Sequence, residues 1–179
     1  DAAAILRDRH SLRVADIAAV RALVPAEVVK TVCEPVATKK RPQNSYDAQF
    51  SIPYTVATAL AKGRFGLAEL DDAALRDEQV LALAAKVEYE VDPDSPFPTY
   101  YSGEVVVTLN DGRELRHREH INRGAAERPI SNADVERKFF ENMQLVTSAA
   151  RAAQVRDLVL AIDRDSAAVD VQRGLAARG

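Results

Sequence analysis

Apolar residues recur every three or four positions in several stretches of the chain, the spacing that gathers them on one face of a helix. The clearest stripe runs through Phe50, Tyr54 and Ala61. Ser51 is its predicted N-cap, and Gly63 is its predicted C-terminal stop. Helices are also predicted over residues 1–9, 71–85 (with an interruption near Arg76 and Asp77), 131–146, 155–162 and 166–178, and one or two helical turns over residues 26–32.

The middle of the chain follows a different pattern. Val87, Tyr89 and Val91 alternate with acidic residues, which predicts a strand with one face in solvent. Further along, Asn110-Asp111-Gly112 separates two strand-like segments and predicts a β-hairpin with Gly112 at a positive φ. Residues 16–24, rich in Val, Ile and Ala, are interpreted as a further strand, although periodicity alone does not separate a strand from a buried helix there. Strands are thus predicted over residues 16–24, 87–91, 104–109 and 113–120, with a proline-containing loop over residues 92–99.

These elements together predict an α+β fold, a small antiparallel sheet of about four strands packed with several helices. The 31 alanines support this division, because none of them lies in residues 86–124, where most of the sheet is expected. A length of 179 residues fits one domain, so residues 1–179 are interpreted as a single α+β unit.

Composition and charge then exclude several classes of protein. An apolar content of 47% with 28% charged residues argues against disorder. No apolar run approaches the ~20 residues that span a bilayer, so we expect no membrane partner. A net charge of −3 gives no reason to expect nucleic acid as a partner.

The usual signatures of catalytic or metal sites are missing from the sequence. There is no glycine-rich phosphate loop and no Gly-x-Ser-x-Gly motif. The lone Cys33 is expected to be a buried apolar residue in a cytoplasmic protein. His10 stands alone, and on the predicted hairpin arm His117 and His120 should point to opposite faces, so we expect surface histidines and no bound metal. Tyr100-Tyr101 beside the hairpin is interpreted as cross-strand or core packing rather than a ligand platform.

One feature does suggest a ligand, the basic run Lys39-Lys40-Arg41 followed by Pro42. Two prolines and polar residues across residues 34–45 predict an exposed loop. Three adjacent cations there could receive the carboxylates of a small substrate, above all through a bidentate Arg41. A solvated loop without a ligand is the alternative, and the residues alone leave both open.

Several segments in order resemble the C-terminal domain of the MmgE/PrpD family. Residues 47–57 read Asp-Ala-Gln-Phe-Ser-Ile-Pro-Tyr-Thr-Val-Ala, which resembles the family's Ala-Gln/Arg-Phe-Ser-x-x-Tyr-x-x-Ala signature. Lys86-Val87, the Asp92-Pro93 pair and the turn ending in Asp111-Gly112-Arg113 form a second match. A third match comprises Gly124, Pro129-Ile130-Ser131 and Lys138-Phe139. The matches extend over nearly the whole chain.

The resemblance implies that this chain is the α+β lid of a longer two-domain enzyme, a C-terminal fragment that lacks a large helical domain. The family's catalytic His, Asp and Lys groups would lie mostly upstream of Asp1, so no catalytic residue is expected in this fragment, and no cofactor. The substrate, a small di- or tricarboxylate, would be shared with the missing helical domain. A homodimer formed through an apolar face of the lid is left open.

The resemblance also bears on the basic run. In cis-aconitate decarboxylases the loop before the signature resembles Tyr-x-Asn-Arg-Pro and reaches toward the substrate. Here the stretch is Thr38-Lys39-Lys40-Arg41-Pro42, so Arg41 and Pro42 match while Thr38 takes the tyrosine position. We therefore expect Lys39, Lys40 and Arg41 to bind substrate.

The implied function is that of a cofactor-independent lyase of the 2-methylcitrate dehydratase type, which would belong to propionate metabolism. The fragment alone is expected to be inactive. The alternatives are an isomerase, epimerase or decarboxylase of the same family, or a non-catalytic binding or assembly module.

Overall fold

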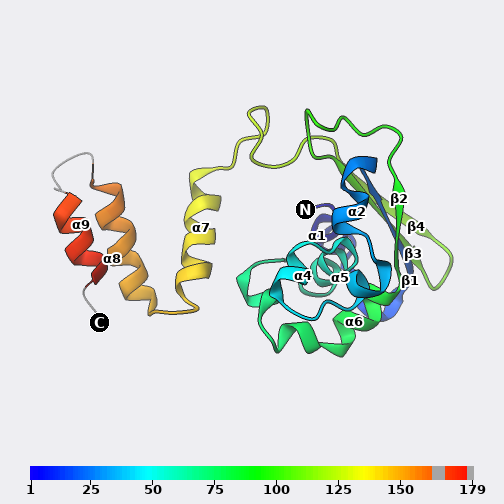
Figure 1. The fold of residues 1–179 in the computed structure, drawn as a ribbon, viewed down its shortest axis with the longest axis horizontal. Coiled ribbons are helices and arrows are strands. Elements are labelled where there is room, and N and C mark those ends of the chain that lie inside the picture. Colours follow the sequence, from blue (N-terminus) through cyan, green and yellow to red (C-terminus); the bar gives the residue numbers. More distant parts are fainter. Residues whose placement is uncertain (163–167, 177–179) are drawn as a thin grey trace. The chain divides into compact units, whose positions relative to one another are not determined.

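The computed structural model describes residues 1–162 and 168–176. Within it, the chain forms two compact units, residues 1–129 and residues 130–179 (Figure 1). Among the described residues, no helix is both long enough and apolar enough to cross a membrane.

The first unit is an α+β layer structure, as predicted. Its strands are β1 (Ile17–Val24), β2 (Val87–Val91), β3 (Gly103–Leu109) and β4 (Glu114–Glu119). Its helices are α1 (Ala2–His10), α2 (Val29–Val32), α3 (Val36–Lys40), α4 (Ser45–Gln49), α5 (Ile52–Lys62) and α6 (Glu78–Ala85), with 3₁₀ turns η1 (Val14–Asp16), η2 (Ala26–Val28), η3 (Leu67–Leu70) and η4 (Ala74–Arg76). Figure 1 shows α1, α5 and α6 on one side of the sheet.

The four strands lie in the order β2-β1-β3-β4, and the sheet is mixed. β3 pairs antiparallel with both β1 and β4, whereas β1 and β2 run parallel, with Val20 opposite Val87. The prediction of an antiparallel sheet was wrong at this one pairing. A period-2 pattern reports which face of a strand is buried but not the strand's direction, and the long helical connection from β1 to β2 permits the parallel return.

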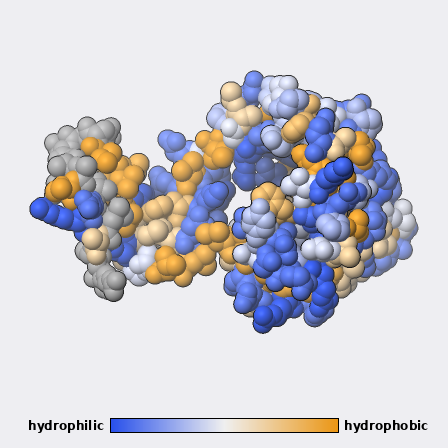
Figure 2. All heavy atoms as spheres, in the orientation of Figure 1, coloured by the Kyte–Doolittle hydropathy of each residue, from blue (hydrophilic) through white to orange (hydrophobic). Residues whose placement is uncertain are grey.

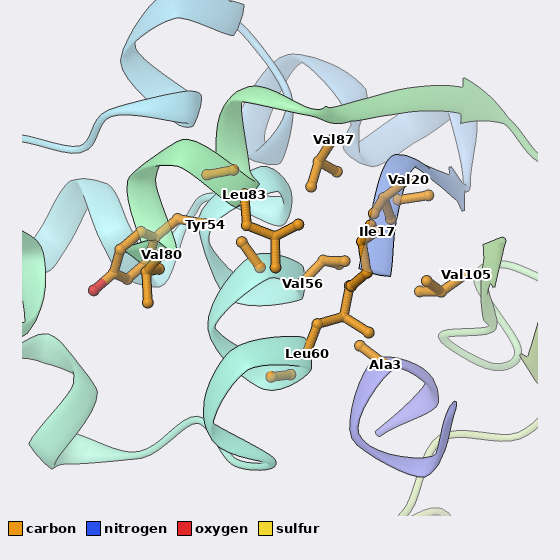
Figure 3. Packing of buried hydrophobic residues seen from close by; sticks show 14 of the residues in the cluster. Ala3, Ile17, Val20, Tyr54, Val56, Leu60, Val80, Leu83, Val87 and Val105 are labelled. Atoms are coloured by element: carbon orange, nitrogen blue, oxygen red, sulfur yellow. The ribbon is translucent and has the colours of Figure 1, made fainter. Parts of the chain in front are cut away.

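The core lies between the sheet and the helices that cover it. Ile17 and Val20 from β1 meet Leu60 from α5 and Leu83 from α6, all fully buried (Figure 3). Cys33 is also fully buried, which confirms its interpretation as an apolar residue.

Several predicted element ends are confirmed by their capping contacts. The Ser51 Oγ accepts a hydrogen bond from Tyr54 N at 3.1 Å, and Gly63 ends α5 at φ 76°. Asp77, at the predicted interruption, caps α6. Gly112 in the hairpin turn has φ 85°, as expected for its position.

Two local predictions differ from the structure. The segment 34–45, predicted as an exposed loop, contains α3 and the start of α4, because Pro35 and Asn44 occupy the positions just before the two short helices. Tyr100 and Tyr101 lie neither in the core nor in a strand pair. Tyr101 is exposed in the loop before β3, with its ring edge-on to Phe97 at 5.1 Å.

The second unit consists of α7 (Asn132–Met143), α8 (Ala149–Leu160) and α9 (Ala168–Ala176). Ser131 caps α7, its Oγ accepting from Asp134 N at 3.1 Å. The predicted helix over residues 166–178 is confirmed over α9, and residues 166, 167, 177 and 178 lie outside the described residues. Hydrophobic side chains gather on the surface of this unit (Figure 2), among them the exposed Val135, Val146 and Leu160.

Candidate functional site

The basic run lies at the C-terminal end of α3, where the chain passes α5, α6 and the start of β2. Arg41 is the C-cap of α3, and its N–H donates to Ala37 O at 3.2 Å. Pro42 follows directly, and the Gln43 side-chain amide donates to Arg41 O at 2.9 Å. The backbone of the run is therefore held on both sides of Arg41.

Lys39 points into the protein rather than toward solvent. Its Nζ donates to two backbone carbonyls, Thr31 O at 2.6 Å and Phe50 O at 2.5 Å, and the residue is buried. These bonds attach α3 to the end of α2 and to the junction between α4 and α5. In this position the ammonium stabilises the packing of α3. That Lys39 also binds substrate remains a prediction.

Lys40 is held by a different part of the molecule. Its Nζ lies 3.1 Å from Ala85 O at the C-terminal end of α6 and 2.5 Å from Glu88 Oε1 on β2. The carbonyl end of a helix attracts a cation, and the carboxylate neutralises it. Lys40 thus attaches α3 to α6 and to the edge strand.

Arg41 presents its guanidinium to solvent, with 63% of its side chain exposed. Its Nη2 donates to Glu78 Oε1 at 3.1 Å, and Glu78 in the first turn of α6 is itself 75% exposed. Each of the three predicted binding residues thus has its own set of partners in the structure. Of the three, Arg41 is the one whose charged group is open to an incoming ligand.

The signature that identifies the next helix also positions the basic run. The Ser51 Oγ donates to Lys39 O at 2.5 Å while it caps α5. Tyr54 is buried, and its hydroxyl donates to the carbonyls of Glu69 and Ala74 at 3.0 and 3.2 Å. Burial raises the pKa of the Tyr54 phenol, so the hydroxyl stays protonated at neutral pH and keeps donating. The signature residues are structural supports for the segment that carries Arg41.

Sequence reasoning missed an exposed aromatic pair on α4 beside the run. The rings of Tyr46 and Phe50 lie 5.0 Å apart, and both side chains are exposed. The helical stripe had assigned Phe50 to the apolar face of the next helix, but Phe50 precedes the N-cap and turns outward. The signal that could have revealed the outward position of Phe50 was the short helix that ends just before the N-cap Ser51.

The histidines and the cysteine do not form a reactive cluster with the basic run. His117 is largely buried, its Nε2 lies 2.6 Å from Glu119 Oε1, and burial together with Arg9 and Arg128 lowers the pKa of its imidazole. Burial raises the pKa of the Cys33 thiol to about 11, which leaves it protonated and unreactive. In the part of the chain that the structure describes, no group of three or more His, Cys, Asp or Glu residues could hold a metal ion.

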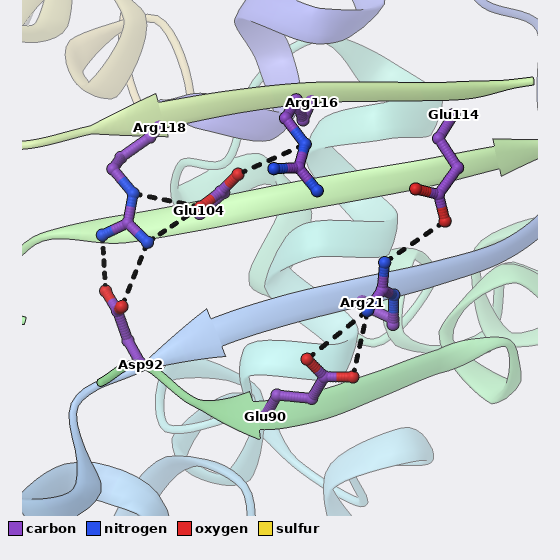
Figure 4. A network of polar contacts seen from close by, with 7 residues as sticks. All are labelled: Arg21, Glu90, Asp92, Glu104, Glu114, Arg116 and Arg118. Carbon is purple, nitrogen blue, oxygen red and sulfur yellow. Dashed lines mark hydrogen bonds and ion pairs between the residues drawn. The ribbon is translucent and has the colours of Figure 1, made fainter. Parts of the chain in front are cut away.

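A larger polar cluster covers the face of the sheet that points away from α5 (Figure 4). Arg118 on β4 donates to both carboxylate oxygens of the buried Asp92, at 2.7 and 3.0 Å, and also contacts Glu104 at 2.8 Å. On the same face, Arg21 lies 3.2 Å from both Glu90 and Glu114. The Arg118 guanidinium holds the pKa of the Asp92 carboxyl below its ordinary value, so this carboxylate is ionised and occupied at neutral pH. The cluster is suited to joining strands rather than to transferring protons.

A cavity of about 390 Å³ lies between the end of α1 and the tip of the hairpin. Its wall carries two arginines, each bound to a neighbouring acid: Arg13 to Asp16 at 2.7 and 2.8 Å, and Arg113 to Asp111 at 2.7 Å. Charge in this wall is thus balanced locally, and the wall does not include the basic run.

Comparisons with known proteins agree with the resemblance described above. A family model, the MmgE/PrpD C-terminal domain, matches residues 1–164. Cis-aconitate decarboxylase of Homo sapiens is 29% identical over 155 residues, which cover 83% of this chain and 31% of that protein. Cis-aconitate decarboxylase of Mus musculus is 28% identical over 129 residues, which cover 68% of this chain and 26% of that protein. The chain thus spans less than a third of the length of these curated relatives.

Proposed function

The chain belongs to the MmgE/PrpD family, as its C-terminal domain, and from this premise we propose that it covers the substrate in a cofactor-independent lyase for small di- and tricarboxylic acids. The reaction we propose is dehydration of the 2-methylcitrate type, with a role in propionate metabolism in the cytoplasm. The observation that carries the proposal is the exposed Arg41 guanidinium on a backbone that its neighbours hold in place.

In this scheme the work is divided between the two parts of a longer enzyme. A base in the remainder of the protein removes a proton next to a substrate carboxylate. Arg41 binds a carboxylate of the same substrate, which neutralises the negative charge that grows in the transition state. A guanidinium suits this role because its planar donors can bind both oxygens of a carboxylate at once.

The contacts of the basic run support different roles for its three members. Lys39 and Lys40 are bound to carbonyls and to Glu88 inside this domain, so they position the segment. Within the described residues, the Arg41 guanidinium contacts one carboxylate, the exposed one of Glu78, and it has five N–H donors in all. We therefore place the substrate-binding role mainly on Arg41.

Decarboxylation is the second candidate, and the two relatives favour it because both are named cis-aconitate decarboxylase. Thr38 argues against decarboxylation, because it occupies the position where the decarboxylase loop carries tyrosine. Thr38 lies within α3, one residue before the buried Lys39.

The product of the reaction separates these candidates. The full-length protein that contains this chain is incubated with 2-methylcitrate and, separately, with cis-aconitate, and the products are followed by proton NMR and by CO₂ release. We expect an unsaturated tricarboxylate and water from 2-methylcitrate, without CO₂. Release of CO₂ from cis-aconitate would replace the dehydratase by the decarboxylase. Turnover of neither acid would favour a non-catalytic module.

A further inference from the structure

The Arg41 guanidinium already holds a carboxylate, that of Glu78. We propose that Glu78 is an internal competitor for the carboxylate ligands of Arg41: it occupies the guanidinium when no ligand is bound and yields it to an incoming carboxylate. The inference rests on the proposed function, because it describes how that binding residue is regulated.

The geometry of the pair is that of an exchangeable contact. A single atom pair, Arg41 Nη2 and Glu78 Oε1, joins the two side chains at 3.1 Å, and both are mostly exposed. Exposed ion pairs are weak, since each partner can return to water at little cost. A ligand carboxylate that binds two guanidinium nitrogens at once forms the stronger contact and can displace Glu78.

The backbone on both sides of the pair is fixed, so that only the side chains need to move. Asp77 caps α6 by accepting from Gln79 N and Val80 N at 3.0 and 3.2 Å, and it also binds Lys62 at 2.7 Å. Glu78, the next residue, thus starts from an anchored helix end, whose partial positive charge favours its carboxylate there. Arg41 starts from the held C-cap of α3.

The same contact is not available to the other two cations of the run. Lys39 is buried and bonded to two carbonyls, and Lys40 is bound both to a carbonyl and to Glu88. A carboxylate would have to break several bonds to reach either ammonium. Exchange is therefore confined to Arg41 and Glu78.

An internal competitor lowers the apparent affinity of Arg41 for a ligand carboxylate in proportion to the fraction of guanidinium that it occupies. From the strength of exposed ion pairs, its removal should tighten carboxylate binding by up to about fivefold. Glu78→Gln keeps the size of the side chain and removes the charge. The matched control is Glu114→Gln, which removes one charge from another exposed ion pair, the one between Glu114 on β4 and Arg21 on β1.

The test uses the ¹⁵N-labelled 179-residue chain with citrate as the tricarboxylate probe, at constant ionic strength set with NaCl. The Nε–Hε resonance of Arg41, identified by its loss in Arg41→Ala, reports binding at the guanidinium. Amide resonances around residue 41 report binding in the Arg41→Ala chains. We expect Glu78→Gln to lower the citrate Kd about two- to fivefold, Glu114→Gln to leave it unchanged, and Glu78→Gln to have no effect when added to Arg41→Ala.

The outcomes separate this inference from the proposed function. If citrate binds at Arg41 but the two glutamine variants behave alike, Glu78 is not a competitor, whereas the carboxylate-binding role of Arg41 stands. The same conclusion follows if Glu78→Gln still tightens binding after Arg41 has been removed. If citrate leaves the Arg41 resonance unchanged in wild type and in both variants, the inference and the binding role are contradicted together.

Discussion

Lys39 illustrates how a residue of the right chemical type can serve the fold before it serves a ligand. Three neighbouring cations, together with the resemblance of this stretch to the decarboxylase loop, predicted that the segment binds substrate. In the structure the Lys39 Nζ reaches the carbonyls of Thr31 and Phe50 instead. Sequence spacing does not reveal such long-range bonds to backbone atoms, because the acceptors are the same in every residue type.

We predict that Lys39→Met destabilises the domain by about 2–4 kcal/mol, since the variant keeps the aliphatic stem but removes the charged donor of two part-buried hydrogen bonds to backbone carbonyls. Urea unfolding followed by circular dichroism measures this change. Lys30→Met, on the exposed surface of α2, is the matched control and should change stability by less than about 0.5 kcal/mol. Equal stability of the two variants would show that the Lys39 bonds are not important for folding.

At the scale of elements, the cluster on the outer face of the sheet joins strands that are not neighbours. Asp92 directly follows β2 at one edge, and Arg118 belongs to β4 at the other edge. Their bidentate contact spans the sheet, and Glu104 on β3 lies on the same guanidinium. The alternating pattern predicted the strand over residues 87–91 with one face in solvent, and the turn signal predicted the two hairpin strands. The order of the strands, and hence this contact, could not be derived from either signal.

Arg118→Ala should therefore lower the free energy of unfolding by about 3 kcal/mol. This is the lower end of the range for a broken buried ion pair, because Arg118 keeps partial access to solvent. Arg116→Ala on the same strand is the control. Arg116 is exposed and lies 3.7 Å from Glu104, so its removal should change the free energy of unfolding by less than about 0.5 kcal/mol. Thermal unfolding of both variants at neutral pH measures the difference. A similar loss in both would argue against a special role for Arg118.

The same pair predicts how stability depends on pH. Arg118 lowers the folded-state pKa of Asp92. The pair therefore contributes its full stabilisation of the folded state above the ordinary Asp pKa of about 3.9, and this stabilisation is lost as the pH falls through the lowered pKa. The stability difference between wild type and Asp92→Asn should accordingly shrink as the pH is lowered from 6 toward 3, as measured by urea unfolding. A difference that is independent of pH would contradict the lowered pKa.

Elements with local signals were predicted best. The Ser51 cap, the Gly63 stop and the hairpin turn at Gly112 each depend on a few adjacent residues, and all three are confirmed. The parallel pairing of β1 with β2 depends on distant parts of the chain. The short helices within residues 34–45 do have local signals, Pro35 and Asn44, which the prediction of a loop did not use. The candidate site divides in the same way: the basic run was found from sequence, whereas the partners that separate Lys39 and Lys40 from Arg41 required the structure.

For the molecule as a whole, the chain represents less than a third of the length of its relatives. The proposed function places the catalytic base in the remainder of a longer protein. We predict that the purified chain alone turns over neither 2-methylcitrate nor cis-aconitate. A coupled assay with the full-length protein as the positive control checks this directly. Measurable dehydration by the chain alone would require a complete catalytic set within these 179 residues.

The central claim is that Arg41 binds a substrate carboxylate, and the most direct test is kcat/KM of the full-length protein carrying Arg41→Ala. Loss of a charge-assisted contact of about 1.5–3 kcal/mol predicts a decrease of roughly tenfold or more. Arg76→Ala, another exposed arginine of the same unit, should leave kcat/KM unchanged. An unchanged kcat/KM for Arg41→Ala, accompanied by dissociation of an oligomer in sedimentation, would instead make this segment an assembly element and contradict the account.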